Sequence, residues 1–119
     1  MKLARNMLHY VSFAAACEAS RLAEQCGLNL QDLGKVVRHT DAITGGAGSI
    51  MFRDDTKPIE PDNFLYQPFL HARVLGEKDL SLALALGEER SVELPLATVA
   101  LARLAEGLGV PHTASSTKE

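Results

Sequence analysis

Residues Lys2–Gln25 lie within the longest stretch of the chain without glycine or proline, and this segment constrains the fold more than any other feature. Leu3, Met7 and Val11 recur along it at helical spacing, and Gly27 then supplies the residue that most readily ends a helix. At about 1.5 Å per residue the segment would form a rod roughly 36 Å long, against a mean helix of about 11 residues. The sequence therefore predicts one unusually long helix that can connect two bodies.

Capping residues, glycine and proline divide the next part of the chain. Asn29, followed three residues later by Asp32, predicts the start of a helix that should end near residues 39–41. The glycine-rich segment 45–48 predicts a break, with a short helical piece around residues 49–52. Residues 53–68 hold three prolines and four acidic residues, a composition typical of an exposed loop.

Two further helices are expected in the second half of the chain. Residues 70–89 resume a helical apolar pattern, which Gly76 weakens, and Pro95 suits the first position of a last helix that Gly107 and Gly109 should close. Aromatic residues are few (Phe 4, Tyr 2, Trp 0), which favours helices over sheets. We therefore predict an all-α fold of about five helices in one domain, residues 1–111, followed by a polar tail at residues 112–119.

Charge and cysteine usage exclude several classes of protein. Lys and Arg total 12 against 15 Asp and Glu, a formal charge of −3, so the chain lacks the basic surface that nucleic acids and anionic membranes select. No apolar run approaches the ~20 residues that span a bilayer. Cys17 and Cys26 show no CxxC spacing and the histidines are scattered, which predicts free thiols and no metal site.

The first residues also have a second interpretation. Lys2 and Arg5 precede an apolar stretch that ends at Cys17, a pattern typical of an export signal. His9 and Ser12 interrupt that stretch with polar side chains. We therefore expect a cytoplasmic protein.

The glycine-rich segment 45–48 invites a phosphate-binding interpretation, because backbone N–H groups at the start of a helix bind anions. A dinucleotide fingerprint would place its third glycine where Met51 stands, and no strand-like run precedes the segment. We therefore interpret it as a helix-breaking turn.

Lys2 and Asn6 are one helical turn apart at the start of the long helix and therefore face the same way. The positive end of a helix disfavours an ammonium group, which suits a lysine that must release a proton. The amide of Asn6 is placed to hydrogen-bond the same substrate oxygen. A lysine and an asparagine at an exposed helix end are also commonplace, so the spacing alone does not establish a site.

Separate segments of the chain resemble one family of enzymes. KLARNML (residues 2–8) and EASRLAEQCGLNL (18–30) resemble the interdomain helix of the β-hydroxyacid dehydrogenases. That family includes 3-hydroxyisobutyrate dehydrogenase, tartronate semialdehyde and glyoxylate reductases and, more distantly, 6-phosphogluconate dehydrogenase. KDLSLALA (78–85) resembles the Lys-Asp-Leu helix of the family, and LPLA (94–97) resembles the entry to its following helix. The segments occur in the family order and near the family spacing.

The resemblance implies hydride transfer between NAD or NADP and a small 3-hydroxy acid. Lys2 would be the general acid/base, and Asn6 would bind the substrate. Lys78 would reach the substrate acid and the nicotinamide end of the cofactor, and Phe69 would pack over that cofactor site. A phenylalanine after a proline-rich loop is more often part of a core, so Phe69 has a structural alternative.

The sequence also departs from the family pattern. In the family a Rossmann domain and a glycine-rich turn precede the lysine, whereas this sequence starts at Met1, and Arg5 stands where asparagine is frequent. We therefore expect a separately expressed or shortened C-terminal domain, inactive without its Rossmann domain, that forms a homodimer through its first and last helices. The alternative is a non-catalytic helical oligomerisation or interaction module. An imine reductase relative fits less well, because those enzymes generally lack the lysine that Lys2 provides.

Overall fold

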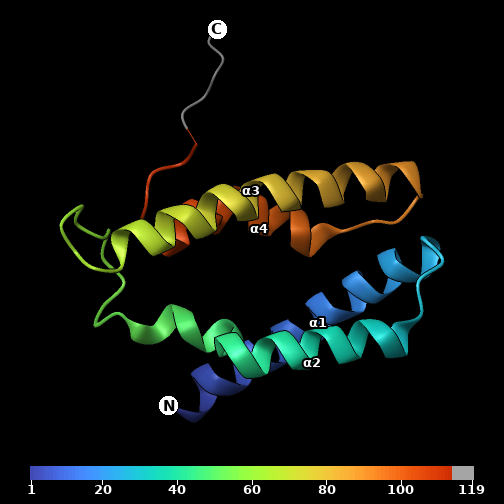
Figure 1. The fold of residues 1–119 in the computed structure, drawn as a ribbon, viewed down its shortest axis with the longest axis horizontal. Helices are drawn as coiled ribbons and strands as arrows, with labels where there is room; N and C mark the ends of the chain where they lie inside the picture. Colours follow the sequence, from blue (N-terminus) through green and yellow to red (C-terminus); the bar gives the residue numbers. More distant parts are fainter. Residues whose placement is uncertain (114–119) are drawn as a thin grey trace, which may run out of the picture.

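A computed structural model describes residues 1–113, and these form four α-helices and one 3-10 helix without a strand (Figure 1). The elements are α1 (Lys2–Gln25), α2 (Leu30–Thr44), η1 (Gly46–Phe52), α3 (Tyr66–Glu89) and α4 (Pro95–Leu108). The predicted all-α fold is confirmed. Of the predicted polar tail, residues 114–119 lie outside the described part of the chain.

Local signals set the end of α1 and the start of α2, and both bounds agree with the prediction. Gly27 adopts a φ of 80°, in the left-handed region that favours glycine, and the N–H of Leu28 donates to the carbonyl of Ala23 at 2.9 Å. The side chain of Asn29 accepts a hydrogen bond from the N–H of Asp32 at 3.0 Å and so caps α2.

The glycine-rich segment behaves differently from the prediction. α2 continues past residues 39–41 to Thr44, where the left-handed Gly45 (φ 85°) ends it. The two following glycines, Gly46 and Gly48, belong to η1 instead of breaking the chain before it. The hydroxyl of Ser49 donates to the carbonyl of Gly46 at 2.8 Å, a local bond that helps to hold this tighter helix. The break between the two helices is therefore Gly45 alone and not the whole segment 45–48.

α3 begins at Tyr66, so the predicted loop at residues 53–68 is shorter than expected and Pro68 lies in the first helical turn. Proline is tolerated there because first-turn N–H groups have no acceptor within the helix, and the N–H of Phe69 already donates to the carbonyl of Leu65 at 3.0 Å. Gly76 lies where α3 meets α4, since a Cβ at this position would be 2.5 Å from Cδ2 of Leu104.

The helices form two layers (Figure 1). α3 and α4 lie side by side in one layer, and α1 crosses α2 in the other. The core of the first layer gathers Phe69, Leu108 and Val110, which are each about nine-tenths buried or more. The segment that precedes α3 closes over this core, because the N–H of Ile59 donates to the carbonyl of Gly109 at 2.8 Å.

Glu18 of α1 connects the two layers. Its side chain is almost completely buried, with a residue exposure of 6%. One carboxylate oxygen accepts a hydrogen bond from the N–H of Leu96 at 2.7 Å, and the other accepts one from the N–H of Ala97 at 3.2 Å. Both N–H groups belong to the first turn of α4. α1 therefore meets the other layer at the start of α4.

The molecule is flat and open. Its extents are 44 × 44 × 25 Å and its radius of gyration is 15.6 Å, against about 13.5 Å for a compact domain of this length. The chain exposes 8867 Å², about 2,600 Å² more than a compact monomer of its mass. Among residues 1–113, no helix is long and apolar enough to cross a membrane. Large apolar side chains on α1 and α2, Met7 and Val37 among them, are exposed.

Candidate functional site

Lys2 and Asn6 lie in the first two turns of α1, as predicted. Lys2 is exposed and Asn6 is half-buried. The helix at this point is held by its own backbone, since the N–H of Arg5 donates to the carbonyl of Met1 at 3.1 Å. The pair is therefore presented on a regular helical turn that leaves the lysine amine accessible.

Lys78 lies on the exposed side of α3 beside a hollow of about 510 Å³. Its side chain is 63% exposed, and its ion pair with Asp79 is long at 3.9 Å and open to solvent. The hollow is lined from α3, α4 and the segment after α4: Val74, Glu77, Lys78, Ser81, Leu101, His112 and Thr113. Lys78 thus places an exposed ammonium group at the edge of a hollow that polar and apolar side chains line together.

A polar network of Arg73, Glu77, His112 and Thr113, in which only Arg73 is buried, forms one wall of this hollow. Glu77 is 3.5 Å from the guanidinium of Arg73, accepts a hydrogen bond from the N–H of Thr113 at 3.3 Å, and lies 3.3 Å from Nδ1 of His112. The Thr113 hydroxyl also contacts both Glu77 and Arg73. Burial raises the pKa of Glu77, but the hydrogen bonds from Thr113 and His112 and the charge of Arg73 outweigh it. The pKa therefore lies below its ordinary value of 4.5.

This network was not predicted from the sequence. The available signal was the spacing of Arg73 and Glu77, which places opposite charges one turn apart on α3. Such pairs are common on exposed helix faces, so spacing alone does not separate this one from the rest. What distinguishes it is burial, because the side chains are only 8% and 14% exposed.

Phe69 lies in the core and not on the surface of the hollow beside Lys78. The residue is 6% exposed and packs with Leu108 and Val110. The guanidinium carbon of Arg53 lies over its ring, 5.9 Å from the centroid. This position agrees with the alternative that Phe69 is a core residue. A cofactor-binding role for Phe69 stays a prediction.

The structure brings Lys2 and Asn6 together but does not bring Lys78 or Phe69 to them. Lys2 and Asn6 share the free end of α1, whereas the hollow beside Lys78 has no lining residue from α1. In Figure 1 the N-terminus lies beyond α2, on the side away from α3. The hollow beside Lys78 is therefore not shared with Lys2 or Asn6.

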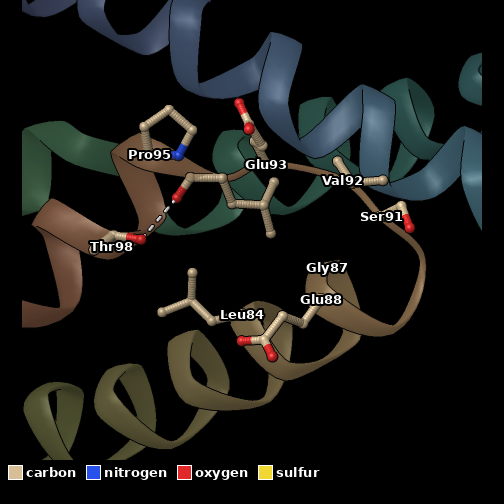
Figure 2. A pocket seen from close by; sticks show the side chains of 9 residues that line it. Leu84, Gly87, Glu88, Ser91, Val92, Glu93, Pro95 and Thr98 are labelled. Carbon is tan, nitrogen blue, oxygen red and sulfur yellow. Dashed lines mark hydrogen bonds between the residues drawn. The ribbon is translucent and has the colours of Figure 1, made fainter.

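A second hollow, of about 690 Å³, lies where α3 turns into α4 (Figure 2). It is lined by the end of α3, the connecting turn and the start of α4, with Leu84, Glu88 and Thr98 around its mouth. Gly87 is required at this turn, since a Cβ there would lie 2.9 Å from the carbonyl oxygen of Val92. None of the predicted site residues lines this hollow, which is a feature of the turn.

The possibilities for metal binding are limited in the described chain. Across residues 1–113, no three His, Cys, Asp or Glu side chains converge on a point where a metal ion could bind. Cys17 is exposed, Cys26 is half-buried, and both are free thiols, as predicted.

Comparisons with known proteins agree on one relationship. Residues 1–110 match a family model described as NAD-binding of NADP-dependent 3-hydroxyisobutyrate dehydrogenase. The chain is also 70% identical to two uncharacterised oxidoreductases of Mycobacterium tuberculosis, from strains CDC 1551 and H37Rv. The match spans 112 residues, which are 94% of this chain and 38% of each relative. The crystal structure of a candidate oxidoreductase from Mycobacterium avium 104 superposes with a TM-score of 0.91 at 73% identity, over 94% of this chain and 40% of that one. The chain thus spans about two fifths of the length of these relatives.

Proposed function

The chain belongs to the 3-hydroxyisobutyrate dehydrogenase family, and we propose that it is the helical substrate-side domain of an NAD- or NADP-dependent 3-hydroxyacid dehydrogenase. The observation that carries the proposal is the match of residues 1–110 to a nicotinamide-binding family model, with Lys2 and Asn6 accessible on one face at the start of α1. In this proposal the domain acts together with a Rossmann domain and does not turn over substrate without it.

Lys2 is proposed to transfer the proton of the substrate hydroxyl group. The amine projects from the first turn of α1 and is exposed, so Nζ is accessible to a substrate hydroxyl group. Asn6, one turn later, presents an amide that donates to the reacting oxygen or to the neighbouring carboxylate. The helix thus holds both groups at a constant separation.

The residues near Lys78 suit the polar end of a nicotinamide cofactor. The ammonium of Lys78, the hydroxyl of Ser81 and the hydroxyl of Thr113 border one hollow of about 510 Å³. We propose that Lys78 contacts the substrate acid and the carboxamide side of the cofactor, which when bound supplies the hydride chemistry. Phe69, a residue of α3 at 6% exposure, packs against Leu108 and Val110 and leaves little of its ring to contact a ligand.

The uncovered layer supports the proposal that a second copy of the chain and the Rossmann domain complete the site. Leu3 is 85% exposed, Met7 66% and Val11 52% along α1. A compact monomer does not leave apolar side chains bare at this density. The excess surface of about 2,600 Å² is of the size that obligate homodimers bury.

The proposal can be tested by joining the chain to a Rossmann domain of the family and measuring NAD(P)H formation from small 3-hydroxy acids, 3-hydroxyisobutyrate included. Lys2→Ala should lower kcat by about 10²- to 10⁴-fold, the usual contribution of a general acid/base. Lys35→Ala removes an exposed lysine from α2 and is the matched control, which should leave the rate within twofold.

An unchanged rate in the Lys2→Ala variant would refute the role of Lys2 in proton transfer. A fusion that binds no nicotinamide and oxidises no hydroxy acid, while the chain still self-associates, would favour the alternative of a non-catalytic helical oligomerisation module. The large exposed apolar surface is the observation that gives this alternative its weight.

A further inference from the structure

Glu18 occupies a position that the proposed reaction does not explain. It is a charged side chain in the middle of a helix whose neighbouring residues are mostly exposed, yet it is 6% exposed itself. Burying a carboxylate is unfavourable unless hydrogen bonds compensate the loss of hydration. Glu18 obtains that compensation from another helix and not from a side chain, through the N–H groups of Leu96 and Ala97 at 2.7 and 3.2 Å.

The first turn of α4 lacks a side-chain cap of its own, and Glu18 supplies the acceptors for two of its N–H groups. Leu94 stands at the N-cap position and has no polar side chain to accept a first-turn N–H group. Pro95 at the first helical position lacks an N–H group altogether, so the N–H groups of Leu96 and Ala97 are the next donors of the turn. A carboxylate that accepts both bonds also complements the positive end of the helix. Glu18 therefore caps α4 from a distance of 78 residues in the sequence.

The two carboxylate oxygens of Glu18 bind two adjacent N–H groups, and this pair of bonds restricts the rotation of α1 relative to α4 as well as its position. A single hydrogen bond would allow α1 to swivel about it, whereas a forked pair fixes the direction of the helix that carries the carboxylate. On α1 the polar ties to the other layer include the 3.5 Å contact between Arg90 and the carbonyl of Gln25, which is at the distance limit for a hydrogen bond. The forked pair is thus much the stronger constraint.

We propose that Glu18 is a positioning residue, which sets the angle of α1 against α4 and thereby the place of the Lys2 end. Lys2 is 16 residues before Glu18, roughly 24 Å along the rod, so a swivel of about 5 to 10° moves that end by about 2 to 4 Å. The consequence for Lys2 rests on the proposed function. The direction of α1 does not, and it can be measured without any catalysis.

The test is a distance measurement by pulsed electron spin resonance on the whole chain, with Cys17→Ser and Cys26→Ala replacing the native thiols. One label pair, at Leu3→Cys and Val99→Cys, reports α1 against α4, and both sites are exposed. The control pair, at Leu82→Cys and Arg103→Cys, reports α3 against α4. Excess unlabelled chain suppresses distances between copies.

In the Glu18→Gln variant, the amide places a donor opposite one of the two N–H groups and so disrupts the fork with little change in shape. The distance between the Leu3 and Val99 labels should shift or broaden by about 2 to 4 Å, and the control pair should be unchanged. Glu18→Asp, which is one methylene too short, should behave like Glu18→Gln. Glu24→Gln, at an exposed carboxylate on the same helix, should leave both pairs unchanged.

Two outcomes would overturn the proposal. Distances identical to the parent chain in Glu18→Gln, with helix content retained by circular dichroism, would show that packing alone sets the angle. Equal broadening of both label pairs would show a general loss of stability and not a positioning role. Because neither outcome involves turnover, a failed activity assay in the fusion would not be confused with either of them.

Discussion

The two layers of the molecule are built on different principles. In the layer of α3 and α4, the helices approach so closely that Gly76 faces Leu104 with no space for a Cβ, and the core residue Phe69 is 6% exposed. In the layer of α1 and α2, the helices cross, and α2 has no buried residue at all. The first layer is stabilised by its own packing, whereas the second is formed by local helix signals and leaves apolar side chains exposed.

The most direct way to break the first layer is Phe69→Ala. Deleting a buried ring should lower the free energy of unfolding by about 3 to 4 kcal/mol. Phe13→Ala, in the second layer, removes a ring that is 53% exposed and should change it by less than about 0.5 kcal/mol in the dissociated chain. Urea titrations followed by circular dichroism at low chain concentration compare the two, and equal losses would contradict the contrast between the layers.

The proposed self-association through α1 can be tested with an introduced charge. Val11→Asp, at a site on α1 that is 52% exposed, should weaken self-association by about 2 kcal/mol, or roughly 30-fold in Kd. Leu82→Asp places the same charge on α3 at a site that is 62% exposed, outside the proposed interface, and is the control. Sedimentation velocity over a range of concentrations measures both. A monomeric parent chain, or an equal effect of the two substitutions, would refute an interface on α1.

Two glycines at the end of α4 test how tightly residues 57–59 pack against this end of the first layer. Gly109 has a φ of 74°, and a Cβ there would lie 3.2 to 3.3 Å from the backbone of residues 57–59, so Gly109→Ala should cost about 1 to 2 kcal/mol of stability. Gly107 is helical and has open space around it, so Gly107→Ala should add up to about 1 kcal/mol. Thermal unfolding should show melting temperatures that move in opposite directions, and a shift of the same sign in both would contradict this.

The smallest expected effect concerns acid sensitivity of the first layer. Because the folded chain lowers the pKa of Glu77, the folded state favours the charged carboxylate. The stabilisation by Glu77 is therefore present above its ordinary pKa of 4.5 and is lost as the pH falls through the lower folded-state value. Glu77→Gln should cost about 1 kcal/mol or less near neutral pH, and this difference should vanish in acid. Unfolding curves at several pH values test this, with the exposed Glu89→Gln as the control; a difference that grows in acid would reverse the sign.

Much of the secondary structure and part of the candidate site were predictable from local patterns. The absence of glycine and proline from Lys2 to Gln25 predicted α1, and helical periodicity alone placed Asn6 one turn after Lys2. The start of α3 was not predicted, because Pro68 was read as part of a loop and in fact lies in a first turn where its missing N–H group is not needed.

The sequence by itself determined the helices and the family, because caps, left-handed glycines and motif spacing act between residues that lie close together along the chain. Only the tertiary structure decided that Phe69 is core, that Gly76 is a contact point and that Glu18 caps a helix 78 residues away. Burial and capping at such separations depend on which helix lies opposite, and no local pattern in the chain carries that information.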